Sequence, residues 1–181
     1  MKFLKYALLA STLIFASCSD DDDNTPDPVN EEEVITTLIV SLDSGSDTVV
    51  MQYQDLDGDG PDAATVTVSG SLNANTTYDG SIVLLNETES PAENVTEEIE
   101  EEDLDHQFFY TVGSGLDVAA EYVDADSEGN PLGLIFVLNT GVASSGGLTF
   151  TLRHEPNKPN TGLENAGGET DIEVTFDVTV E

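Results

Sequence analysis

The stretch DIEVTFDVTV, residues 171–180, alternates polar and apolar side chains one by one along its whole length. Successive side chains of a β-strand point to opposite faces of the sheet, so this period of two predicts a strand with one buried face. Residues 148–154 repeat the pattern, with Leu148, Phe150 and Leu152 on the apolar side. The two segments predict sheets that cover a hydrophobic core.

Seven further segments have the composition of strands, because they are rich in Val, Ile, Thr, Tyr and Phe and end at Gly, Asn, Asp or Pro. They are residues 34–42, 47–54, 64–69, 78–85, 106–112, 116–123 and 132–139. Nine short strands predict an all-β fold, an immunoglobulin-like or fibronectin-like β-sandwich over residues 34–181. The segment LNANTTY, residues 72–78, resembles the tyrosine corner of such sandwiches. Residues 91–104 predict a short acidic insertion, helical or disordered, because carboxylates repel one another at i,i+4.

The first 17 residues predict an export signal. Lys2 and Lys5 form a positive n-region, and the apolar run 6–16 is shorter than the ~20 residues of a membrane-spanning helix. The tetrapeptide FASC, residues 15–18, resembles a lipobox, with Phe15 where Leu is usual. This resemblance implies cleavage before Cys18 and a covalent lipid on it. The many like charges and prolines of residues 18–33 predict a disordered acidic tether.

The residues after the cysteine carry a further resemblance. SDDDD, residues 19–23, resembles the tag that directs Bacteroidota lipoproteins to the outer face of the outer membrane. With the segments HQFFY (106–110) and LRHEPNK (152–158), the chain looks like a short flavobacterial surface lipoprotein, a group sometimes labelled "type 1 periplasmic binding fold superfamily". This implies a lipid-anchored protein of the outer membrane that faces the cell exterior. The labelled fold alternates strands and helices, which residues 34–181 do not, so we do not predict that fold.

Composition narrows the functional classes. The chain has 37 acidic and four basic residues and a formal net charge of −33, which excludes nucleic acid as a partner. Its single cysteine is Cys18, so the mature protein has no disulfide and no thiol nucleophile. There is no Gly-x-Ser-x-Gly elbow, phosphate-binding Gly loop or HExxH pair. We therefore expect a protein that is not an enzyme.

Two loops match the first half of a calcium-loop pattern, with acidic residues at positions 1, 3 and 5 and Gly at position 6. The expected calcium ligands are Asp55, Asp57 and Asp59 in the first loop and Asp124, Asp126 and Glu128 in the second. Position 12, where the pattern has Glu, holds Val66 and Ile135. The alternative is a pair of Asp/Gly-rich turns whose carboxylates accept hydrogen bonds from their own backbone.

The two histidines stand at strand ends. His106 begins the predicted strand 106–112 and His154 ends the strand 148–154. If these strands pair antiparallel, the two imidazoles meet. Acidic neighbours that would complete a metal site are Glu102, Asp103, Asp105 and Glu155. Such nitrogen and oxygen ligands suit zinc, copper or iron, and two histidines could also hold haem iron from both sides. The alternative is that each histidine bonds separately to a neighbouring carboxylate.

Two functions follow from these patterns. The first is a binding module that captures a metal ion or metal complex for a TonB-dependent outer-membrane transporter. The second is a structural or adhesive surface protein stiffened by calcium. In addition, Asp47-Thr48-Val49 resembles the O-glycosylation site of Bacteroidota, which implies a glycan on Thr48.

Overall fold

The structure is a computed structural model, and it describes residues 33–58 and 60–181. The predicted export signal, Cys18 and most of the predicted tether lie outside the described residues, as does Asp59. Within the described part, no helix is long and apolar enough to cross a membrane.

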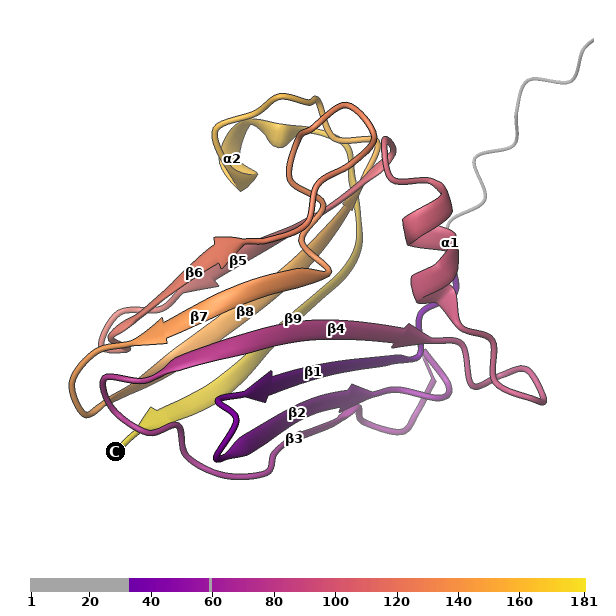
Figure 1. Cartoon of the computed structure of the whole chain (residues 1–181). Coiled ribbons are helices and arrows are strands. Elements are labelled where there is room, and N and C mark those ends of the chain that lie inside the picture. Colours follow the sequence, from indigo (N-terminus) through magenta and orange to yellow (C-terminus); the bar gives the residue numbers. More distant parts are fainter. Residues whose placement is uncertain (1–32, 59) are drawn as a thin grey trace, which may run out of the picture. The chain divides into compact units, whose positions relative to one another are not determined.

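Nine strands and two short helices follow one another along the chain (Figure 1). The strands are β1 (Thr37–Asp43), β2 (Thr48–Gln54), β3 (Thr65–Val68), β4 (Thr77–Leu85), β5 (His106–Val112), β6 (Val118–Tyr122), β7 (Ile135–Thr140), β8 (Ser144–His154) and β9 (Glu169–Val180). The helices are α1 (Val95–Glu101) and α2 (Leu163–Ala166). Each strand overlaps a predicted one, which confirms the all-β prediction. The four-residue helix α2 is too short to leave a helical period in the sequence and was not predicted.

The strands form two antiparallel sheets, one of six strands in the order β3-β2-β1-β4-β7-β6 and one of three in the order β5-β8-β9. Their apolar faces build one hydrophobic core. Phe136 of β7 lies 4.8 Å from the Tyr110 ring of β5 and 5.8 Å from the Phe150 ring of β8, measured between centroids. Aromatic contacts therefore join the two layers, and the predicted sandwich is confirmed.

Two details of β4 support this packing. Tyr78 is fully buried, and its hydroxyl accepts a hydrogen bond of 2.8 Å from the backbone N–H of Asn73, as in a tyrosine corner. Gly80 pairs with Phe136 of β7, whose ring covers it so closely that a Cβ would lie 2.4 Å from a ring carbon. Glycine is therefore required at this position by the neighbouring ring.

The acidic insertion contains a helix, α1, over Val95–Glu101. Helix α1 buries Val95 and Ile99, and Thr96 accepts a 2.8 Å hydrogen bond from the backbone N–H of Leu84 in β4. It lies beside the end of β4 (Figure 1). Packing against the sheet therefore stabilises a helix that its own charges disfavour.

Strand β9 contains a β-bulge that the alternating sequence does not reveal. Leu152 of β8 pairs with Ile172, but the next residue, Arg153, pairs with Thr170. Asp171 is therefore an extra residue on β9. Strict alternation would place Asp171 outward with Glu173, whereas its side chain is only 1% exposed. A bulge re-aims a side chain in this way, and here it turns a carboxylate toward the interior.

Candidate metal centre

The register of β5 and β8 places His106 directly opposite His154. The strands therefore pair antiparallel, which is the condition under which the sequence predicts that the two imidazoles meet. Both side chains point inward, since they continue the buried alternation of Phe108 on β5 and of Phe150 and Leu152 on β8. The two imidazole rings lie edge to face, 4.7 Å apart between centroids, and both residues are buried.

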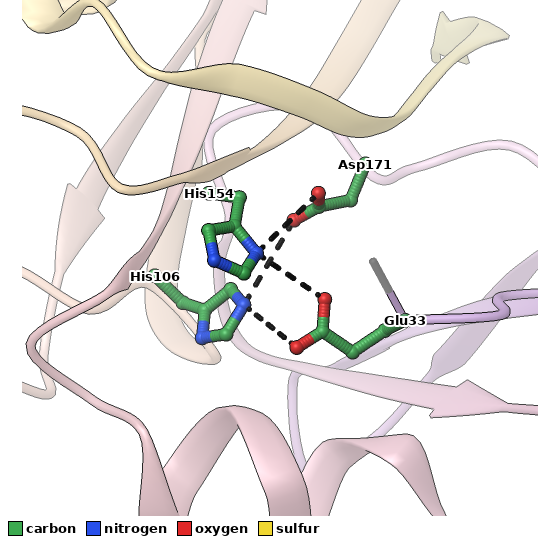
Figure 2. A group of neighbouring side chains, drawn as sticks. All are labelled: Glu33, His106, His154 and Asp171. Atoms are coloured by element: carbon green, nitrogen blue, oxygen red, sulfur yellow. Dashed lines mark ion pairs between the residues drawn. The ribbon is translucent and has the colours of Figure 1, made fainter. Parts of the chain in front are cut away.

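Two carboxylates face the imidazoles (Figure 2). Asp171 comes from the bulge of β9, and Glu33 comes from the segment that leads into β1 of the other sheet. Glu33 Oε1 lies 3.2 Å from His106 Nε2, and Glu33 Oε2 lies 3.4 Å from His154 Nδ1. The oxygens of Asp171 lie 4.0 Å and 3.9 Å from the same two nitrogens. The site therefore joins the two sheets of the sandwich.

These spacings fit a single small cation. One ligand atom from each of the four residues lies within 4.8 Å of all the others. For metal–ligand bonds of about 2.0–2.1 Å, the edges of a tetrahedron are about 3.3–3.4 Å long. Each oxygen of Glu33 lies at about that length from one of the two histidine nitrogens, and the contacts of Asp171 are about half an ångström longer. A buried Glu/His/His/Asp cluster that could hold a metal ion is therefore present.

Hydrogen bonding supports the same conclusion. His106 Nδ1 lies 3.2 Å from the backbone oxygen of Glu102. When Nδ1 donates its proton there, Nε2 carries a lone pair, and that lone pair faces carboxylate oxygens. Among the described residues, His106 Nε2, His154 Nδ1 and Glu33 Oε2 are buried without a hydrogen-bond partner. A metal ion between them would satisfy all three atoms, as would protons on both imidazoles through ion pairs.

The carboxylates that the sequence favoured as ligands lie elsewhere. Glu102, Asp105 and Glu155 are exposed and lie outside the cluster. Asp105 and Glu155 each adjoin a histidine whose side chain points inward, so their own side chains point away from the core, and Glu102 is the C-cap of helix α1. Glu102 contributes only its backbone oxygen, and the amide of Glu155 donates to the backbone oxygen of Asp105 at 2.6 Å. The expectation that the histidines' sequence neighbours supply the oxygen ligands is wrong.

The two carboxylates that do complete the cluster escaped the sequence analysis. Glu33 was placed at the end of the tether, whereas it belongs to the compact unit Glu32–Glu181 and its side chain is 6% exposed. Asp171 was placed on the outer face of its strand. No local pattern marks either residue, because their positions depend on which distant segments pair and where the bulge falls.

The haem alternative does not fit this geometry. An iron held from both sides needs the whole macrocycle between its two axial imidazoles. The rings of His106 and His154 are in direct edge-to-face contact and buried in the sandwich. That expectation is wrong.

The second Asp-rich loop is a network of hydrogen bonds within the protein. The carboxylate of Asp124 accepts three backbone N–H bonds of 2.8–2.9 Å, from Gly133, Leu134 and Ile135. Asp126 accepts bonds from the amides of Glu128 and Asn130, and its Oδ2 pairs with Lys158 Nζ at 3.1 Å. Glu128 is exposed.

This network contradicts the calcium site expected at Asp124, Asp126 and Glu128, because protein donors already take the lone pairs that calcium needs. Burial raises the pKa of Asp126, but hydrogen bonds from Asn130 and Lys158 outweigh it, and the net pKa is lowered. The alternative of a turn whose aspartates bond to backbone describes this loop.

The first Asp-rich loop shows bonds of the same kind. Asp55 accepts from the hydroxyl of Tyr53 at 3.3 Å, and Asp57 accepts from the amide of Asp62 at 3.2 Å. With Asp59 outside the described residues, calcium at Asp55, Asp57 and Asp59 stays a prediction. Thr48 is exposed at the start of β2, and its glycosylation also stays a prediction.

Negative charge accumulates beside the histidine cluster. Burial raises the pKa of the Glu98 carboxyl on α1, and the charges of Glu93, Glu33 and Glu102 raise it further. These carboxylates lie close enough together to repel one another, so a cation near Glu33 would lower their electrostatic energy.

No protein-family model, no curated protein and no solved structure matches the chain.

Proposed function

We propose that this protein is a lipid-anchored surface protein of the outer membrane whose sandwich binds one divalent transition-metal ion. Its ligands are His106, His154, Glu33 and Asp171. The observation that carries the proposal is the convergence of buried ligand atoms from the three-stranded sheet and from the segment before β1. Three of these atoms have no hydrogen-bond partner among the described residues. Burial of such atoms is costly unless a proton or a cation satisfies them.

The ligand set favours zinc. Two imidazole nitrogens and two carboxylate oxygens at near-tetrahedral spacing match its preferences, whereas calcium takes six to eight oxygens. Copper(II) binds nitrogen and oxygen ligands more tightly in general but prefers a tetragonal arrangement. Four protein ligands also leave no open position for a substrate, which is typical of structural rather than catalytic zinc sites. This supports binding without catalysis.

The position of the site suggests what the ion does. Glu33 leads into the six-stranded sheet, and the other three ligands belong to the three-stranded sheet. An ion held between them cross-links the two layers in a protein whose only cysteine is Cys18. Burial on all sides favours retention of the ion, so we propose a stabilising metal rather than cargo for a TonB-dependent transporter.

The test is a calorimetric titration of the mature protein in detergent, after removal of metal with a chelator. Wild type should bind one Zn²⁺ per chain, and His106→Ala combined with His154→Ala should abolish binding. Glu102→Gln and Glu155→Gln are matched controls, since they remove exposed carboxylates beside the histidines and should leave affinity unchanged. A wild type that binds none of Zn²⁺, Co²⁺, Mn²⁺, Fe²⁺ and Cu²⁺ would refute the proposal.

A further inference from the structure

Arg153 and Lys158 are the two basic residues that remain beyond the predicted export signal, in a chain with 37 acidic residues. Carboxylates are available over the whole surface, yet both side chains reach backbone segments next to the metal cluster. Lys158 lies at the segment that carries His106, and Arg153 lies at the segment that carries Asp171.

Lys158 holds the start of β5. Its side chain is 5% exposed, and its ammonium donates to the backbone oxygens of Asp103 and His106, both at 2.6 Å. The third donor goes to Asp126 Oδ2 at 3.1 Å. All three donors of the ammonium are therefore used. One of these hydrogen bonds goes to the backbone oxygen of His106 itself, so Lys158 fixes the main chain that carries the imidazole.

Arg153 holds the segment before the bulge. Its Nε and one terminal nitrogen donate to the backbone oxygen of Gly167 at 2.9 Å and 2.7 Å. The same terminal nitrogen donates to Gly168 at 2.8 Å, and the other donates to the hydroxyl of Thr170. The planar guanidinium thus clamps residues 167–170, which end directly before Asp171.

The segment around Gly168 packs closely against the end of β8. Gly168 has a φ of +68°, and a Cβ on it would lie 2.1 Å from the backbone oxygen of His154. The turn that places Asp171 therefore rests against the strand end that places His154. Arg153, one residue before that histidine, ties the two together.

We propose that Lys158 and Arg153 are positioning residues of the metal site, Lys158 for His106 and Arg153 for Asp171. The proposal rests on the metal-binding function proposed above. A metal site requires its ligands to be held within about 0.5 Å of the productive geometry, and groups that orient ligands are typically worth 10–100-fold in metal affinity. Neither side chain touches the ion; each acts through the backbone of a ligand.

The test measures zinc affinity and the visible spectrum of the Co²⁺-loaded protein for Lys158→Met and Arg153→Lys. Methionine keeps the length of the lysine and removes its three donors. Lysine keeps the charge of the arginine and loses the planar fork. Each variant should weaken zinc binding by about tenfold or more. It should also change the visible bands of the Co²⁺-loaded protein, whose position and intensity report the coordination geometry.

Gly80→Ala is the matched control, because a Cβ on Gly80, in the middle of β4, would press on the Phe136 ring of β7. It should lower the melting temperature without changing zinc affinity. If Lys158→Met fails to fold, Asp126→Asn provides a milder test. It weakens the ion pair of Lys158 with residue 126 but keeps the lysine, so it should lower zinc affinity by a smaller factor.

The outcomes separate the two proposals. If wild type binds no metal, the proposed function fails. If wild type binds zinc and these variants bind it within about twofold of wild type with an unchanged cobalt spectrum, the positioning role is refuted and the proposed function stands. Equal losses in Gly80→Ala and in the clamp variants would also refute positioning, since general destabilisation would then explain them.

Discussion

Removing the metal should release Glu33 from the cluster. The ligand oxygens of Glu33 and Asp171 lie within 4.8 Å of each other, and the two side chains are 6% and 1% exposed. Two unit charges at that distance repel by about 3.5 kcal/mol at an effective dielectric constant of about 20. A divalent ion between them turns this repulsion into attraction. Without the ion, and with both imidazoles neutral, the less restrained carboxylate should move out.

Glu33 is the less restrained of the two. Asp171 lies within β9, whereas Glu33 precedes β1. Thr36, three residues after Glu33, donates a backbone hydrogen bond of 3.0 Å to Leu85. A free energy of about 3.5 kcal/mol corresponds to a factor of several hundred in an equilibrium constant. The metal-free protein should therefore populate a state in which residues 33–35 have left the cluster.

Hydrogen exchange measured by mass spectrometry would detect this state. The amides of residues 34 and 35 should exchange much faster after chelation, while β1 beyond Thr36 keeps its protection. In Glu33→Gln the repulsion is absent, so exchange at these amides should no longer respond to zinc. Glu98→Gln, which removes a nearby carboxylate of α1, is the matched control and should respond as wild type does. Equal exchange in wild type with and without zinc would refute the reasoning.

Four further outcomes follow from the same structure. At free zinc near 100 times Kd, the free energy of unfolding in urea should rise by about 2.7 kcal/mol and return to its starting value with EDTA; no rise would contradict selective binding to the folded state. Gly80→Ala should cost about 1–3 kcal/mol in thermal unfolding, since its Cβ would meet the Phe136 ring at 2.4 Å. Phe150→Ala, at a fully buried ring, should cost about 3–5 kcal/mol in the same assay, and a loss below 1 kcal/mol would argue against the described core. The lowered pKa of Asp126 means that its ion pair with Lys158 stabilises the fold above the unfolded pKa and is lost as pH falls through the lower folded pKa. Asp126→Asn should therefore be less stable at pH 7 and lose less stability on acidification, measured by urea unfolding from pH 7 to 2; parallel curves would contradict this.

The strands were predictable because their signal is local. The alternation in β9, and the β-branched and aromatic residues of the other strands, can be read from neighbouring residues without knowledge of which strands pair. The contact between His106 and His154 could also be predicted, on the condition that their strands pair. One histidine begins a strand and the other ends one, and antiparallel pairing brings such ends together. The sequence left open whether the acidic insertion is helical or disordered, and packing against β4 favours helix α1.

The sequence by itself determined an all-β sandwich of nine strands, a histidine at the end of each of two strands and a high negative charge. Only the tertiary structure decided which carboxylates face those histidines. Glu33 reaches them across the two sheets, and Asp171 reaches them because a bulge shifts the pairing of β9 by one residue. A one-residue shift moves a side chain to the other face of a sheet, and that shift depends on contacts between segments far apart in the chain.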